Sequence, residues 1–238
     1  MNRSEHDEGA KKRCLIMMAK YPEPGQVKTR LAAEIGVGHA AELSKRFILD
    51  LLQTLPSRDW EIQMALYPWE RKEEMSAVVG EKYVLIPQRG CDLGERMGHV
   101  FIELFAEAFQ EIIMIGSDAP DLPTEFITEA FSVLTDHDAV LGPACDGGYY
   151  LIGFRQGAFS PLLFNGLPWS TPEIFSQQLK RLREQKLHVY ILPPWQDIDT
   201  LADLKKMAGL AAMTSFADSL TMAYIGTTGL LDMKSNHA

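Results

Sequence analysis

The sequence predicts an α/β protein in which a mostly parallel sheet lies between two layers of helices, a three-layer α/β/α sandwich. Short β-prone apolar runs recur along the chain, and most are separated by segments with the apolar periodicity of helices. The runs are apolar almost throughout, as expected for strands that helices cover on both faces. The expected strands are residues 14–18, 62–67, 84–86, 112–115, 139–141, 149–154 and 189–192.

Helical segments fill most of the intervals between these runs. Residues 40–55, 93–109 and 126–134 carry apolar side chains three or four positions apart, which is the spacing of one helix face. Residues 27–35 predict a short helix, and Thr171-Pro172-Glu173 predicts a helix start with proline at its first position.

The hairpin and domain organisation follow from turn residues and from the absence of linkers. Asp146-Gly147-Gly148 separates two apolar runs and predicts a β-hairpin. No repeat or low-complexity segment divides the chain, so we expect one domain over residues 14–208. Residues 1–13 would form an N-terminal tail. Residues 209–238 would form a C-terminal extension that could contact a second subunit, as in a homodimer.

Composition and charge exclude several classes of protein. None of the apolar runs in the 238 residues approaches the roughly 18–20 positions needed to span a bilayer, and the polar N-terminus lacks the apolar core of a signal peptide. We therefore expect a cytoplasmic protein without membrane contact. The net charge of -9 argues against nucleic-acid binding. Cys14, Cys91 and Cys145 form no CxxC pair, which predicts neither a disulfide framework nor a zinc site.

Ligands of open parallel sheets bind at the carboxyl ends of strands, so the loops that follow the strands are the candidate sites. The first loop, AKYPEPGQVKTRL at residues 19–31, contains two prolines and Gly25. Lys28 and Arg30 would lie in the first turn of the following helix, where cations oppose the helix dipole unless an anion is bound. The loop therefore predicts a phosphate site, with a solvated surface turn as the alternative.

Two acidic loops also follow strands. Asp118 and Asp121 come directly after residues 112–115, and Asp197 and Asp199 follow the last strand. Carboxylates in such loops suit Mg²⁺ or Mn²⁺, which bind one or two acids together with substrate phosphates. The alternative is helix capping, by Asp121 or Thr124 in the first loop and by Asp199 or Thr200 in the second.

A third loop, QRGCDLGERM at residues 88–97, lies between a strand and a helix. Gln88 and the backbone amides of this loop could read the edge of a nucleobase. Capping and a solvated helix face would account for the same residues, so both interpretations stay open.

In their order along the chain, these segments resemble an uncharacterised bacterial family of glycosyltransferase-A-like proteins (DUF2064), related to the 2-phospholactate and molybdenum-cofactor guanylyltransferases. The resemblance runs from Cys14 to Leu204. The segments that carry it are AKYPEPGQVKTRLAAEIG, QRGCDLGERM, GSDAPDLP, HDAVLGPACDGGYYLIG, WST and DIDTLADL. It implies a nucleotide-binding fold and a divalent metal that bridges protein acids to a nucleotide.

The resemblance also implies roles for individual residues. The implied phosphate-binding residues are Lys20, Gly25, Lys28 and Arg30. The implied base-proximal residues are Gln88, Leu93 and Gly94. Asp118 would be the main metal ligand, and Asp199, or otherwise Asp197, would be the second. Asp146, Gly147 and Gly148 would line the acceptor or phosphate side.

We therefore expect a metal-dependent transferase that takes a nucleotide or nucleotide-sugar donor and a small-molecule acceptor. Glycosyl transfer is favoured, and nucleotidyl transfer with release of pyrophosphate is the alternative. In both reactions Mg²⁺ or Mn²⁺ on Asp118 would neutralise charge on phosphate oxygens, together with Lys28 and Arg30. Asp146 would be the acceptor base of glycosyl transfer. A non-catalytic nucleotide-binding protein is the alternative from another class, and its binding would survive the loss of Asp118.

Overall fold

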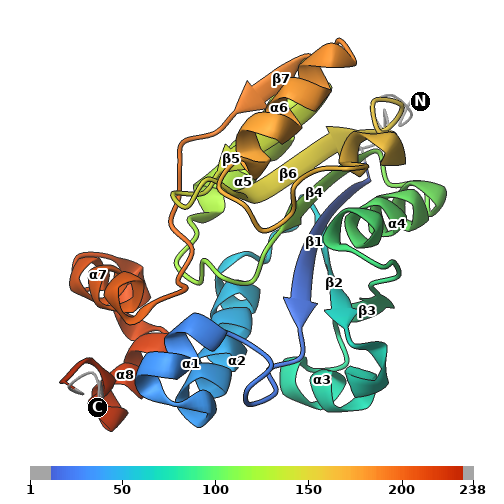
Figure 1. Cartoon of the computed structure of the whole chain (residues 1–238). Coiled ribbons are helices and arrows are strands. Elements are labelled where there is room, and N and C mark those ends of the chain that lie inside the picture. Colours follow the sequence, from blue (N-terminus) through green and yellow to red (C-terminus); the bar gives the residue numbers. More distant parts are fainter. Residues whose placement is uncertain (1–11, 233–238) are drawn as a thin grey trace, which may run out of the picture.

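The computed structural model describes residues 12–232, which form a three-layer α/β/α sandwich (Figure 1). The central sheet has seven strands in the order β3-β2-β1-β4-β6-β5-β7. Its strands are β1 (Arg13–Lys20), β2 (Glu61–Tyr67), β3 (Val84–Pro87), β4 (Glu111–Ile115), β5 (Ala139–Pro143), β6 (Tyr149–Arg155) and β7 (Val189–Ile191). All seven expected strands are present, within a few residues of the expected bounds.

Strand direction determines which loops meet. β6 is antiparallel to its neighbours β4 and β5, whereas the other pairs are parallel. The β5–β6 pair is the hairpin that Asp146-Gly147-Gly148 predicted, with an irregular register between Gly142 and Pro143. Because β1, β2, β3 and β4 run in parallel, the loops that follow them gather at one edge of the sheet.

In the described range, eight α-helices cover the sheet and extend one side of it. Their bounds are α1 (Thr29–Ile35), α2 (Val37–Thr54), α3 (Lys72–Val79), α4 (Leu93–Ala106), α5 (Thr124–Val133), α6 (Ile174–Glu184), α7 (Leu201–Ala211) and α8 (Leu220–Thr228). One apolar core joins α2, α3 and α5 to one face of the sheet, and a second joins α4 and α6 to the other face. The expected helices on both faces are confirmed.

Short 3₁₀ turns complete the description: Trp69–Arg71, Pro161–Phe164, Ser215–Asp218 and Leu230–Asp232. Within residues 12–232, none of the helices is both long and apolar enough to cross a membrane.

Two expected helix starts are wrong. The helix expected over residues 27–35 begins at Thr29, and Lys28 precedes it with a left-handed backbone (φ 48°). The helix expected to open at Thr171-Pro172 begins at Ile174, because the Thr171 hydroxyl donates to the Pro168 carbonyl at 2.8 Å instead of capping the helix. In both places local turn contacts replace the first helical turn.

Residues 209–232 continue the fold in helices and short turns. α7 extends to Ala211, and α8 packs with α1, α2 and α7 around a third apolar core. The buried Asp50 carboxylate of α2 accepts hydrogen bonds from the backbone N–H groups of Leu220 and Thr221, at 2.8 and 3.0 Å. The C-terminal segment is therefore anchored on its own domain, and a contact with a second subunit stays a prediction.

Candidate functional site

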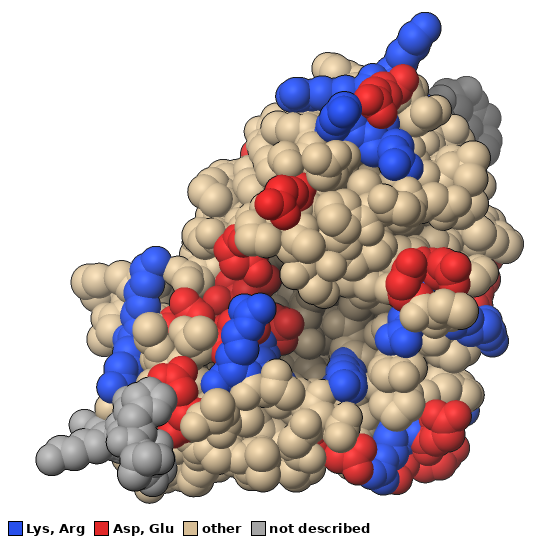
Figure 2. All heavy atoms as spheres, viewed as in Figure 1, with Lys and Arg blue, Asp and Glu red and all other residues tan. Residues whose placement is uncertain are grey.

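A cavity of about 410 Å³ opens at the edge where the parallel strands end. Figure 2 shows a hollow in the middle of this face, with acidic and basic side chains next to each other at its rim. Nine lining residues carry the argument below: Lys20, Lys28, Arg30, Tyr67, Gln88, Leu93, Arg96, Asp118 and Asp199. The cavity thus brings together the first loop, both acidic loops and the QRGCDLGERM segment.

Lys28 connects the two acidic loops. Its Nζ lies 2.6 Å from Asp118 Oδ1 and 3.2 Å from Asp199 Oδ1. The Lys28 side chain is 4% exposed, whereas those of Asp118 and Asp199 are 47% and 36% exposed. Burial by itself would lower the pKa of Lys28, but the charges of the two carboxylates outweigh it and raise that pKa. The ammonium is therefore charged and is held by both acids.

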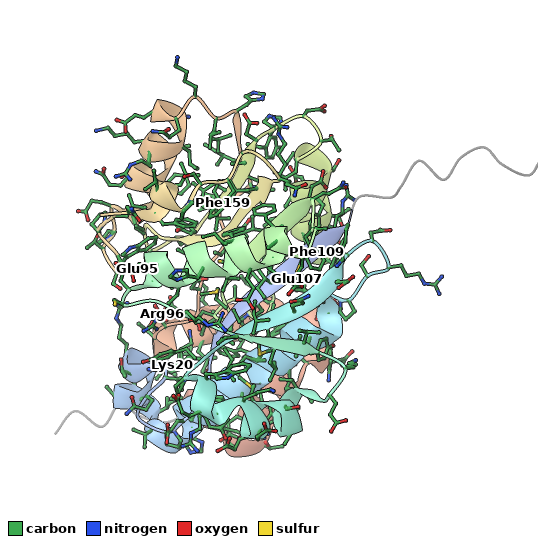
Figure 3. All side chains as sticks on the ribbon, turned by 90° about the vertical axis from the view of Figure 1, so that its right-hand side faces the viewer. Lys20, Glu95, Arg96, Glu107, Phe109 and Phe159 are labelled. Atoms are coloured by element: carbon green, nitrogen blue, oxygen red, sulfur yellow. The ribbon has the colours of Figure 1, made fainter. Side chains whose placement is uncertain are left out.

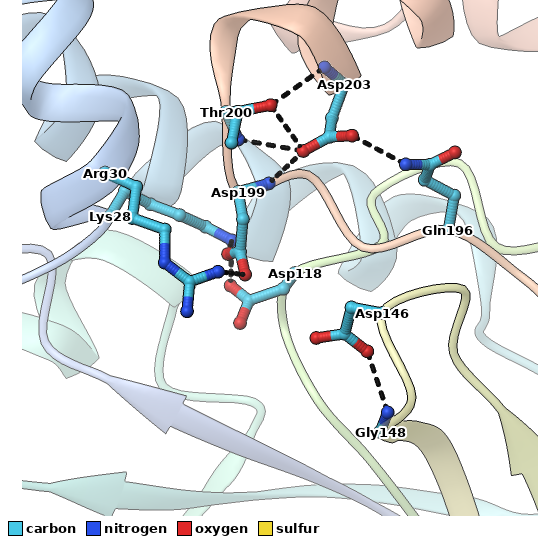
Figure 4. A network of polar contacts seen from close by, with 9 residues as sticks. All are labelled: Lys28, Arg30, Asp118, Asp146, Gly148, Gln196, Asp199, Thr200 and Asp203. Atoms are coloured by element: carbon cyan, nitrogen blue, oxygen red, sulfur yellow. Dashed lines mark hydrogen bonds and ion pairs between the residues drawn. The ribbon is translucent and has the colours of Figure 1, made fainter. Parts of the chain in front are cut away.

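Backbone contacts position the two carboxylates, and Figure 4 shows those around Asp199. The N–H of Ile198 donates to the Asp118 carbonyl at 2.9 Å, which joins the loop after β4 to the loop before α7. Thr200 and Asp203 form a capping box at the start of α7, and the Asp203 carboxylate also accepts the Asp199 N–H at 3.3 Å. The capping alternative is thus correct for Thr200, and it leaves the Asp199 side chain facing Lys28.

The last turn of α1 is tied to the start of α7 by a further contact. The Glu34 carboxylate accepts the Leu201 N–H at 3.0 Å, which ties α1 to the start of α7. Arg30, 71% exposed, extends along the outside of the cavity with its Nη1 at 3.5 Å from Asp199 Oδ2. Lys28 and Arg30 therefore differ: Lys28 is buried between carboxylates, whereas Arg30 is exposed and can meet a ligand from solvent.

Two further predicted acids, Asp197 and Asp146, lie outside the lining of this cavity. Burial, followed by the charge of Asp118, raises the pKa of Asp197 to about 7, and the charges of Asp146 and Asp199 add to this effect. Asp146 is exposed, and its Oδ1 accepts the N–H of Gly148 at 2.8 Å. Four carboxylates therefore lie within electrostatic reach of one another at this edge.

These acids fit a hard divalent cation that also binds a substrate phosphate. Asp118 and Asp199 each place one oxygen within 3.2 Å of the same nitrogen, so one cation can contact both. Over the described residues, 12–232, no group of three or more His, Cys, Asp or Glu side chains is placed to hold a metal by itself. Mg²⁺ and Mn²⁺ bind readily through one or two carboxylates when water and phosphate complete the shell.

Gln88, Tyr67 and Arg96 also line the cavity. Gln88 Nε2 donates to the carbonyls of Ala19 and Ala65, at 3.1 and 2.7 Å, which anchors the amide to the ends of β1 and β2. Arg96 lies 3.9 Å above the Tyr67 ring, and its Nε donates to the Gly90 carbonyl at 3.1 Å. Figure 3 shows Arg96 and Lys20 on the same side of the molecule, near the first turn of α4.

Arg96 and Tyr67 are site residues that the sequence reasoning missed. Arg96 follows Leu93 by three positions, so the two share one face of α4. Tyr67 is the last residue of β2 and so lies at the carboxyl end of a strand. The spacing of Arg96 from Leu93 and the place of Tyr67 at the end of a strand are the sequence features that could have predicted them.

Several predicted residues lie outside the cavity lining. Gly25 is in a turn with φ +79°, next to Gln26, whose carbonyl accepts from Lys20 Nζ at 2.7 Å. Gly94 packs against the Trp169 ring, which leaves no room for a Cβ atom. Gly147 and Gly148 form the turn that carries Asp146.

Asp121 lies apart from Asp118 although both are on one loop. Its carboxylate accepts from Trp195 Nε1 at 3.1 Å, and burial raises its pKa. It lines a separate cavity of about 760 Å³. Neither Asp121 nor Thr124 caps α5, because Pro123 precedes that helix and the Thr124 hydroxyl donates to the Thr54 carbonyl.

Comparisons with known proteins agree with this architecture. The family model described as uncharacterized protein conserved in bacteria (DUF2064) matches residues 50–171. A crystal structure from Desulfovibrio desulfuricans G20, provisionally described as a nucleotide-diphospho-sugar transferase, is 36% identical with a TM-score of 0.89. The match covers 93% of this chain and 97% of that chain. The comparison with curated proteins gave no match.

Two more distant structures share the fold. One is CMP:2-keto-3-deoxy-manno-octonic acid synthetase in complex with CTP, at 16% identity and a TM-score of 0.54 over 85% of this chain and 99% of that chain. The other is 4-diphosphocytidyl-2C-methyl-D-erythritol synthase from Anaerococcus prevotii DSM 20548, at 11% identity and a TM-score of 0.53 over 83% and 96%. The resemblance seen in the sequence motifs is confirmed, and the chain belongs to the DUF2064 family of bacterial proteins.

Proposed function

We propose that this protein is a metal-dependent transferase that uses a nucleotide-activated donor, with glycosyl transfer from a nucleotide-sugar as its reaction. The observation that carries the proposal is the Lys28 ammonium held between Asp118 and Asp199 at a cavity at the ends of the strands. The 36% identical protein described as a nucleotide-diphospho-sugar transferase supports the class of donor.

The residues of the cavity suit departure of a nucleoside diphosphate. Lys28 and Arg30 would place fixed positive charge where the leaving phosphates gain negative charge. Mg²⁺ or Mn²⁺ on Asp118 and Asp199, or on Asp197, would act as a Lewis acid on the same phosphates. Gln88, anchored by its amide, leaves its carbonyl oxygen as an acceptor for a base edge.

Asp146 is the proposed acceptor base of glycosyl transfer. It is exposed, it sits on a turn fixed by its own hydrogen bond to Gly148, and its charge reaches Asp197. Such a carboxylate can accept the proton of an acceptor hydroxyl as the new glycosidic bond forms.

Nucleotidyl transfer is the second candidate. Lys20, Lys28, Arg30 and Arg96 all line the cavity, which is more positive charge than the diphosphate of a nucleotide-sugar requires. A triphosphate would use these cations more fully, with pyrophosphate as the leaving group.

The test is a thermal-shift screen of nucleoside diphosphates, nucleoside triphosphates and nucleotide-sugars, each with and without Mn²⁺ or Mg²⁺. A ligand that binds the folded state raises the unfolding midpoint by mass action. We expect a metal-dependent shift with one nucleotide-sugar, followed by detection of the transferred sugar by mass spectrometry. A shift confined to one triphosphate would select nucleotidyl transfer instead.

Asp118→Asn and Asp121→Asn form a matched pair for this screen. They lie three positions apart on one loop, but Asp118 contacts Lys28 whereas Asp121 contacts Trp195. We expect Asp118→Asn to lose the metal-dependent shift and Asp121→Asn to keep it. A nucleotide shift that needs no metal and survives Asp118→Asn would indicate a non-catalytic nucleotide-binding protein.

A further inference from the structure

The Lys28 ammonium stands where a divalent cation on Asp118 and Asp199 would stand. Its Nζ is 2.6 and 3.2 Å from one oxygen of each carboxylate, and the side chain is 4% exposed. A divalent cation on the same two oxygens would lie a few ångströms from the ammonium, and the two positive charges would repel each other. The protein's own lysine and a metal ion therefore compete for the same two ligands.

We propose that Lys28 holds the cation position in the free protein and yields it only when a phosphate group gives the ammonium a new partner. This inference rests on the proposed function. Lys28 is then a positioning residue that makes divalent metal and donor diphosphate bind together, and binding of either alone is weak.

Burial explains why the lysine does not simply move aside. An ammonium that leaves its carboxylates must find another anion, because an unpaired buried charge is strongly unfavourable. Among residues 12–232, Lys28 forms ion pairs with Asp118 and Asp199 alone. The nearest ring, that of Phe47, lies 5.7 Å from Nζ and is too weak a replacement. A phosphate in the cavity would supply the missing anion.

The backbone limits how far Lys28 can travel. Its left-handed conformation precedes α1 directly, and the Ala32 N–H donates to its carbonyl at 2.7 Å. α1 is in turn tied to α7 through Glu34 and Leu201. The ammonium can therefore rotate within the cavity on its side chain, but the chain that carries it stays in place.

Thermodynamic linkage makes the proposal measurable. If Lys28 couples the two ligands, pyrophosphate must raise the affinity for Mn²⁺ by the same factor as Mn²⁺ raises the affinity for pyrophosphate. Removing the ammonium should free the carboxylates for the metal and reduce this factor.

The experiment is isothermal titration of Mn²⁺ into wild type, Lys28→Met and Arg30→Met, each with and without inorganic pyrophosphate. Pyrophosphate carries the group that every candidate donor shares, and its complex with Mn²⁺ in solution is the same for all variants. We expect Lys28→Met to bind Mn²⁺ alone at least tenfold more tightly than wild type, and its coupling factor to fall at least tenfold. Arg30→Met removes one charge near the same Asp199, at 3.5 Å and on the exposed side, and should change Mn²⁺ affinity less than threefold.

Two further variants secure the interpretation. Lys28→Gly removes the ammonium with a residue that tolerates the left-handed backbone, and it should reproduce Lys28→Met. Adding Asp118→Asn to Lys28→Met should abolish the gain, which locates the bound Mn²⁺.

The outcomes separate this inference from the proposed function. Equal Mn²⁺ affinity in wild type and both Lys28 variants, with the metal bound in all of them, would overturn the inference and leave the metal site intact. Absence of Mn²⁺ binding in every variant, with pyrophosphate present, would remove the metal from the proposed function and the inference with it.

Discussion

Gly147→Ala tests whether the turn that carries Asp146 is locked against the segment before α6. Gly147 has φ +93°, and a Cβ atom there would lie 2.2 Å from the Pro172 carbonyl oxygen. The Gly147 carbonyl also accepts the Phe175 N–H at 3.0 Å, so the two backbones are in direct contact. Because the neighbour is main chain, neither side can yield without moving the turn.

The expected loss of stability has two parts. A left-handed backbone costs a residue with a Cβ about 1 kcal/mol. Relieving a contact of 2.2 Å would strain or break the bond to Phe175 and shift the turn, at roughly 2 kcal/mol more. A total near 3 kcal/mol corresponds to a fall in the unfolding midpoint of roughly 6–12 °C for a chain of this size.

Gly157→Ala is the matched control for the backbone part. Gly157 has φ +87°, but no atom lies within 4 Å of its Cβ position, so it should cost about 1 kcal/mol. Urea and thermal unfolding of both variants measure the difference. Equal losses in Gly147→Ala and Gly157→Ala would show that the turn and the Pro172 segment are not tightly packed, and the reasoning would be wrong.

Three other substitutions test the site and its supports. Asp197→Asn should raise the unfolding midpoint above that of wild type by an amount that grows from pH 5 to pH 8. Burial raises the pKa of Asp197 in the folded state to about 7. Between about pH 4 and 7 the folded state therefore binds a proton that the unfolded state has lost, and the wild-type protein loses stability as the pH rises. A difference in midpoint that does not change with pH would contradict this. Asp50→Ala should lower the free energy of unfolding in urea by about 2 kcal/mol, since the Asp50 carboxylate accepts two N–H groups of α8. Ser219→Ala should lower it by about 1 kcal/mol, because the Ser219 hydroxyl accepts one N–H group of the same helix. Equal losses would refute the anchoring role of Asp50. Gly94→Ala should lower the unfolding midpoint, because its Cβ would lie 2.6 Å from the Trp169 ring; an unchanged midpoint would show that the ring moves freely.

The strands were predictable because a strand that is buried on both faces is a continuous apolar run in the sequence. β4, EIIMI, is buried along its whole length, and such a run is recognisable without any partner. The Asp146-Gly147-Gly148 turn is similarly local, since the turn residues themselves favour the hairpin. The sheet edge that holds the candidate site follows from these two facts and from the parallel direction of the strands.

The contacts inside the site were not predictable in the same way. Lys28 and Asp199 are 171 positions apart, and their pairing depends on how α1 and α7 pack. Helix periodicity predicted that Lys28 lies in the first turn of a helix. In the structure Lys28 precedes the helix with a left-handed backbone, and from there its side chain reaches both carboxylates. No local pattern encodes ion pairs with carboxylates from two other loops.

The charge balance of the edge supports the proposal that a cation and a phosphate bind there together. Asp118, Asp146, Asp197 and Asp199 would repel an anionic donor, and Lys28 is already engaged by two of them. We therefore expect Lys28 to bind a donor diphosphate only when another cation binds Asp118 and Asp199 in its place. A divalent ion, in turn, can bind these carboxylates only when a phosphate pairs with the Lys28 ammonium. Each ligand relieves the obstacle to the other. That mutual requirement is common to glycosyl and nucleotidyl transfer, so the metal and diphosphate coupling can be measured before the acceptor is known.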